Sequence, residues 1–145
     1  MVRNKNKSKN KKSLSDSVNS KKVVINITTR KKGSGGLSVD TNILKYILNR
    51  YFRKSVEIHI VDFFSYESGY ADINFHLELV SNFFFEFGTL NILIPNQEWY
   101  YKNWISFLPK FDYVFTKTEY ASEIFSNLIS NLETKPEIIK TGWMT

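Results

Sequence analysis

Short apolar runs, rich in β-branched residues, recur along the chain from position 23 onward. VVINIT and NILI are almost continuously apolar, which is typical of strands buried on both faces of a sheet. SVEIHIV and INFHLEL instead alternate apolar and polar positions, another strand pattern. The pattern predicts six strands, at residues 23–29, 56–61, 73–78, 90–94, 112–116 and 137–141.

Helical spacing appears between several of these strands. One predicted helix follows the first strand, with Ser38 or Asp40 as N-cap and a buried face of Ile43, Leu44, Ile47, Leu48 and Tyr51. A second follows the fifth strand, with Thr116 and Glu119 as a capping box and Ala121, Ile124, Phe125 and Leu128 inside. Residues 100–109 predict a short helix, whereas residues 81–88 fit either a helix or a buried turn.

Strands alternating with helices indicate a single Rossmann-like α/β domain over residues 23–145, with a mostly parallel sheet and helices on both faces. Residues 1–22 contain eight basic residues and one acid, and we interpret them as a disordered basic tail. The remaining body contains 12 basic and 13 acidic residues, so it offers no general attraction for nucleic acid.

Other sequence signals narrow the class further. The chain has no cysteine, which excludes a thiolate nucleophile and a cysteine-based zinc site. We find no secretory signal and no apolar run long enough to span a membrane, and we expect a cytoplasmic protein. No metal-ligand cluster is apparent, and no cofactor is expected. His59 and His76, the only histidines, lie mid-strand, where packed or surface side chains are more common than catalytic ones.

The glycine-rich loop KKGSGGLS follows the first strand, where ligands bind in open α/β sheets. Gly33, Gly35 and Gly36 are candidates for backbone contacts with phosphate or sugar oxygens, although the loop also fits a merely flexible turn. A dinucleotide fingerprint is an alternative. It would need glycine where Ser38 stands, with Asp62 as the ribose-binding acid.

The segment IPNQEWYYKNW leaves the fourth predicted strand at the same kind of position. Asn96 and Gln97 are candidate ligand-binding residues, and Glu98 is a candidate general base. Trp99 and Trp104 are candidates for stacking on a sugar ring. Alternatively, Glu98 is an ordinary acid at a helix N-terminus and the aromatic side chains belong to the core.

Four segments together resemble the N-terminal domain of group-1-type GT-B glycosyltransferases, including glycosyltransferase-like proteins of large DNA viruses. They are VVINITTRKKGSGGL, NILIPNQEWYYKNW, FDYVFTKTEYASEIF and IIKTGWMT, and the resemblance that they carry spans roughly residues 23–145. In that family this domain holds the acceptor, its glycine-rich loop approaches the donor phosphates, and a second domain binds the nucleotide-sugar. Group-1 members often have a histidine after the fourth strand, where this chain has Gln97 and Glu98.

The resemblance implies a glycosyltransferase-like acceptor-binding domain that is independent of metals, takes a nucleotide-sugar as co-substrate and uses Glu98 catalytically. It also implies Lys117 as a substrate-binding residue, a sugar or glycan acceptor, and a separate donor-binding domain as partner. We expect half of a GT-B fold, truncated before that domain and almost inactive alone. A non-catalytic sugar- or nucleotide-binding module and an NAD-type Rossmann fragment remain the alternatives.

Overall fold

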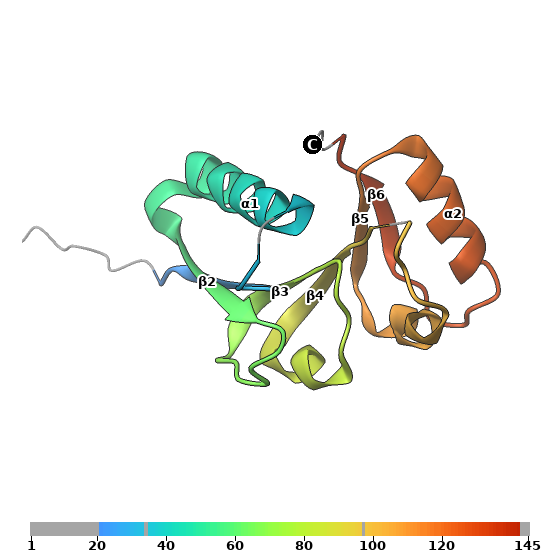
Figure 1. Cartoon of the computed structure of the whole chain (residues 1–145), viewed down its shortest axis with the longest axis horizontal. Helices are drawn as coiled ribbons and strands as arrows, with labels where there is room; N and C mark the ends of the chain where they lie inside the picture. Colours follow the sequence, from blue (N-terminus) through green and yellow to red (C-terminus); the bar gives the residue numbers. More distant parts are fainter. Residues whose placement is uncertain (1–20, 34, 97, 143–145) are drawn as a thin grey trace, which may run out of the picture.

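A computed structural model describes residues 21–33, 35–96 and 98–142. Its six strands form one all-parallel sheet (Figure 1). The strands are β1 (Val23–Thr29), β2 (Val56–Asp62), β3 (Ala71–Leu77), β4 (Gly88–Ile94), β5 (Tyr113–Thr116) and β6 (Glu137–Lys140). The single α/β domain and all six predicted strands are therefore confirmed, with boundaries that differ by two residues at most. The predicted tail lies outside the described residues up to position 20.

Two α-helices and three 3-10 segments connect the strands. They are α1 (Gly36–Phe52), η1 (Arg53–Ser55), η2 (Asn82–Phe87), η3 (Lys102–Lys110) and α2 (Glu119–Ile129). Figure 1 shows α1 beside β1 to β3 and α2 at the other end of the sheet, beside β5 and β6. Residues 81–88, which fitted either a helix or a turn, form the short 3-10 segment η2 and enter β4 at Gly88.

The strand order is β2-β1-β3-β4-β5-β6. The chain passes from β1 to β2 on one side and then returns to place β3 on the other side of β1. The order therefore reverses between β1 and β3, and the carboxyl ends of two such strands are the usual ligand crevice of an open α/β sheet. This order differs from the 3-2-1-4-5-6 order of dinucleotide-binding domains.

Both faces of the sheet are buried, against different partners. Leu44 and Leu48 of α1 pack on the face formed by side chains such as Ile27 and Ile92. Phe125 of α2 and Leu108 of η3 pack with Leu93 on the opposite face. The alternation of Ile92 and Leu93 along β4 follows from the two-residue period of a strand and separates the two cores.

Both helix caps differ from the sequence prediction. Helix α1 begins at Gly36 with Gly35 as N-cap, so neither Ser38 nor Asp40 caps it. Thr118, not Thr116, caps α2 by accepting a hydrogen bond from the Ala121 N–H. Thr116 is instead the last residue of β5. Capping requires the residue just before the first helical turn, and each predicted cap was two or more residues away from it.

The buried face of α1 was predicted only in part. Leu44 and Leu48 are buried, whereas Ile47 and Tyr51 are exposed. Two polar residues near the beginning of the helix, Asp40 and Thr41, are buried although the pattern did not predict it. The exposed apolar residues lie toward the C-terminal end of α1, where helical spacing alone does not show how far the packing against the sheet extends.

A neutral polar network lies beneath η2, on the sheet face that packs against η3 and α2; we call the core on this face the second core. The network consists of Asn74, His76 and Asn91, and we call it the amide network. Asn74 donates to the carbonyl of Phe84 at 2.8 Å, and Asn91 donates to the carbonyl of Phe85 at 3.2 Å. His76 Nε2 lies 3.0 Å from Asn91 Oδ1. The side chains of the sheet thereby provide donors for carbonyls that the short 3-10 segment leaves without helical partners.

Candidate functional site

The carboxyl ends of β1, β3, β4 and β5 meet at one edge of the sheet because all these strands are parallel. The glycine-rich loop, Glu78, the segment from Asn96 to Trp99, and Lys117 leave the sheet there. The loop and the Asn96–Trp99 segment follow β1 and β4, which are separated by β3 alone. Contact of both segments with one ligand stays a prediction.

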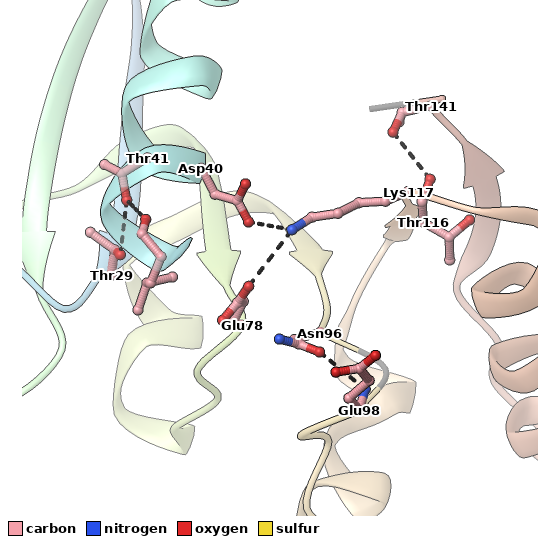
Figure 2. Close-up of polar contacts among 10 residues, drawn as sticks. Thr29, Asp40, Thr41, Glu78, Asn96, Glu98, Thr116, Lys117 and Thr141 are labelled. Atoms are coloured by element: carbon pink, nitrogen blue, oxygen red, sulfur yellow. Dashed lines mark hydrogen bonds and ion pairs between the residues drawn. The ribbon is translucent and has the colours of Figure 1, made fainter. Parts of the chain in front are cut away.

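Three charged side chains converge at this edge, and we call them the charged cluster: Asp40, Glu78 and Lys117. Figure 2 shows the Lys117 ammonium between the carboxylates of Asp40, from α1, and Glu78, directly after β3. Lys117 forms an ion pair with Asp40, and its Nζ lies 3.7 Å from Glu78 Oε1. The side chains are 2% exposed for Asp40, 13% for Lys117 and 18% for Glu78.

Local hydrogen bonds fix the backbone that carries this cluster. Thr41, next to Asp40, has its hydroxyl 3.1 Å from that of Thr29 and donates to the Leu37 carbonyl at 2.7 Å. The first turns of α1 are therefore held against the end of β1. Glu78 has a φ of 62° and its N–H donates to the Ile94 carbonyl at 2.9 Å. A left-handed non-glycine residue costs about 1 kcal/mol and is often part of a functional site.

The surroundings of the charged cluster raise the pKa of the Glu78 carboxyl. Burial raises the pKa of the Glu78 carboxyl above its usual value, and the nearby Asp40 carboxylate raises it further by repulsion and by hydrogen bonding to the protonated form. The Lys117 ammonium and a hydrogen bond from Asn96 oppose this shift. In this site of two carboxyl groups and one ammonium, the Glu78 carboxyl is therefore harder to ionise than an ordinary carboxyl.

The glycine-rich loop has the backbone freedom that its sequence suggested. Gly33 and Gly35 have φ values of 144° and 130°, which other residues rarely adopt. Gly36 begins α1 with open space around it, and no side chain caps the helix. The three glycines line a small cavity of about 150 Å³ together with Arg30 and Ser38. A role of their N–H groups in ligand binding stays a prediction.

The candidates after β4 are divided between the charged cluster and solvent. Asn96 lies near enough to Glu78 to lower the pKa of its carboxyl, and its Oδ1 accepts from the Glu98 N–H at 3.0 Å. The Glu98 side chain is exposed, and Trp99 is 68% exposed. Gln97 lies outside the described residues. Trp104, the second stacking candidate, packs with Tyr100 against the second core.

Sequence reasoning did not identify Asp40 and Glu78 as members of a site. Asp40 was interpreted as a cap and Glu78 had no role, whereas Lys117 and Asn96 were already candidates. One signal that points to Glu78 is a charged residue directly after a buried strand of a parallel sheet. The described residues contain no group of three metal-ligating side chains and no helix long and apolar enough to cross a membrane.

Neither a protein-family model, nor a curated protein, nor a solved structure matches the chain. The resemblance to glycosyltransferases therefore depends on the sequence motifs alone, and the functional assignment depends on the site.

Proposed function

We propose that the chain binds a sugar or glycan acceptor at the carboxyl edge of its sheet, as the acceptor-side domain of a GT-B-type glycosyltransferase does. The observation that carries the proposal is the position of the charged cluster. Asp40 lies near the beginning of α1, and Glu78 directly follows β3. Both residues are next to the reversal of strand order between β1 and β3. Ligands of open α/β sheets bind at this place.

The chemistry of the edge suits a polyhydroxylated ligand. Carboxylates accept hydrogen bonds from hydroxyl groups, and the buried Asp40 Oδ1 has no partner in the described part of the chain. The exposed rings of Trp99 and Tyr101 follow on the neighbouring segment and offer an apolar surface of the kind that packs on a sugar ring.

Glu78 is the residue of the cluster best suited to take a proton from an acceptor hydroxyl. Its pKa is raised toward the range in which a carboxylate is an effective general base at neutral pH. Lys117 positions both carboxylates, and Asn96 favours the ionised form of Glu78. Glu98, the base expected from the resemblance, is a second candidate on the exposed part of the same edge.

In this proposal the N–H groups of Gly35 and Gly36 approach the phosphates of a nucleotide-sugar, which a donor-binding partner domain would hold. Transfer by this chain alone would be barely detectable, because the transition state needs both walls of the cleft. A non-catalytic sugar-binding module would use the same residues without transfer. The NAD-type alternative is disfavoured by Ser38 at the third glycine position.

The experiment is a titration of the chain with free monosaccharides, short glycans and nucleotide-sugars, followed by amide NMR shifts. We expect shifts at Gly35, Gly36 and Lys117 and in the segment containing Trp99. Glu78→Gln and Asp40→Asn should each weaken binding about tenfold, because each removes a charge-assisted hydrogen bond.

Glu57→Gln is the matched control, because Glu57 is an exposed acid of β2 that bonds His59. It should leave sugar binding unchanged. No shift with any sugar or nucleotide-sugar, or equal weakening by Glu57→Gln and Glu78→Gln, would contradict the proposal. Quenching of tryptophan fluorescence by NAD, without any response to sugars, would favour the dinucleotide alternative instead.

A further inference from the structure

A second polar cavity lies along the flank of α1 that faces β2, away from the charged cluster. Its volume is about 250 Å³, and Ile60 of β2 forms its floor on the sheet side. The polar residues around it come from the loop after β1 and from α1: Arg30, Lys31, Ser38, Thr41, Asn42 and Lys45. Asp40 points to the opposite flank of the helix, where it meets Lys117 after β5.

Helical spacing explains why these side chains share one cavity. Ser38, Asn42 and Lys45 are four and three residues apart and therefore lie on one stripe of α1. Thr41 borders this stripe, and its hydroxyl bond to Thr29 ties the wall of the cavity to the end of β1. The cavity is thus built on a helix and a strand end that hold each other in place.

The charge of the cavity is strongly one-sided. Three of the residues around it are cations and none is an acid. Asp62, at the end of β2, contacts this group with its carboxylate, which accepts a hydrogen bond from the Lys31 backbone N–H at 3.4 Å. Cations gathered around one space repel each other unless an anion lies between them.

We propose that this cavity binds the phosphate group of a small phosphorylated ligand. Arg30, Lys31 and Lys45 neutralise its charge, and the Ser38 hydroxyl and the Asn42 amide donate hydrogen bonds to its oxygens. Pockets for drug-sized ligands start at roughly 300 Å³. A volume of about 250 Å³ therefore suits a phosphate with a few neighbouring atoms. This site is separate from the carboxylates proposed to bind a sugar, and it does not depend on them.

The test is a titration of the intact chain with inorganic phosphate, glucose 6-phosphate and AMP at constant low ionic strength. Amide shifts of Ser38, Asn42 and Lys45 report on the cavity. Lys45→Gln should weaken phosphate binding about tenfold, because it removes one charge-assisted contact and keeps a good helix former on an exposed position. Lys32→Gln, an exposed cation next to Lys31 that does not line the cavity, should change it less than twofold.

Binding of any of the three compounds that is weakened about tenfold in Lys45→Gln and changed less than twofold in Lys32→Gln supports the proposal. Binding of none of them overturns it, as does equal weakening by both variants, which would indicate a general charge effect. Much tighter binding of an oligonucleotide with a steep salt dependence would also overturn it, in favour of a nucleic-acid surface. Glu78→Gln should leave phosphate binding intact, which separates this result from that of the sugar titration.

Discussion

The molecule has a buried and a partly buried polar cluster, and the two differ in composition, place and partners. The amide network of Asn74, His76 and Asn91 is neutral, lies under η2, and joins bonds among its own members to bonds with the backbone carbonyls of Phe84 and Phe85. The charged cluster of Asp40, Glu78 and Lys117 lies at the carboxyl edge and is bonded mainly to itself. One cluster connects segments of the fold, whereas the other gathers charge where ligands of such sheets bind.

This difference separates polar burial that supports the fold from polar burial that suits chemistry. A buried amide that satisfies a backbone carbonyl removes a cost that irregular structure would otherwise impose. Two carboxyl groups placed together raise a cost instead, since the Asp40 carboxylate disfavours the ionisation of Glu78. Proteins retain such an arrangement chiefly where a proton or a ligand is handled.

The amide network should therefore dominate stability. Asn74→Leu removes the donor to the Phe84 carbonyl and the acceptor of the Thr28 hydroxyl, leaving two buried groups without partners. At about 1–3 kcal/mol for each group, we expect the free energy of unfolding to fall by about 4 kcal/mol. Urea denaturation measures this, with Asn127→Leu on the exposed face of α2 as control. A loss below about 1 kcal/mol would show that the network is dispensable.

The charged cluster should be sensitive to the loss of its cation. Lys117→Met leaves the buried Asp40 carboxylate without its ion-pair partner, and we expect a loss of about 3 kcal/mol at neutral pH. Adding Asp40→Asn should recover part of this loss, because the uncompensated charge is then gone. The double variant is compared with both single variants by thermal or urea unfolding. Failure of Asp40→Asn to recover any stability would mean that Lys117 acts mainly through other contacts.

The two histidines offer an internal comparison of pH dependence. Burial lowers the pKa of His76 to about 4, against 6.5 in the unfolded chain. At pH values between these two pKa values, the His76 side chain is protonated in the unfolded chain but not in the folded chain. The free energy of unfolding therefore falls as the pH is lowered through this interval. Between pH 6 and pH 4.5 we expect a loss of about 2 kcal/mol from this group.

Two variants check this assignment. His76→Phe keeps an aromatic ring beside Phe85 and Phe111 and should abolish that part of the pH dependence. His59→Gln changes an exposed residue and should leave it intact. The same pH slope in His76→Phe and in the wild type would assign the titration to other groups.

The strands could be predicted from the sequence because each is a short apolar or alternating run, and that pattern survives any tertiary arrangement. His76 was expected from its place in a strand to be a packed or surface side chain, and it is packed. The caps could not be placed, because several adjacent polar residues fit each helix start. Strand order also has no local signal, so the reversal between β1 and β3 emerged only in three dimensions.

The charged cluster shows what limits prediction of a site. Asp40 and Lys117 are 77 residues apart in the chain, and nothing near either residue indicates its partner. Lys117 and Asn96 were predicted as ligand-binding residues, and the structure adds their contacts with two acids, while any binding role stays a prediction. Topology supplies the missing step, since residues that directly follow parallel strands meet at one edge.

The smallest expected effect concerns Glu78, and its sign distinguishes the two clusters. Because the pKa of the folded Glu78 is raised, the folded chain binds more protons than the unfolded chain just above the ordinary carboxyl range. Wild-type stability should therefore fall as the pH rises through that interval, the reverse of the His76 effect.

The variant Glu78→Gln resembles the protonated form. Its free energy of unfolding should therefore stay within about 1 kcal/mol of the wild-type value at the acid end and rise relative to the wild type as the pH rises. Urea unfolding at a series of pH values measures the difference, with the exposed Glu98→Gln as a control that should follow the wild type throughout. A difference between Glu78→Gln and the wild type that is constant, or that shrinks with rising pH, would remove the basis for Glu78 as the proton acceptor of the site.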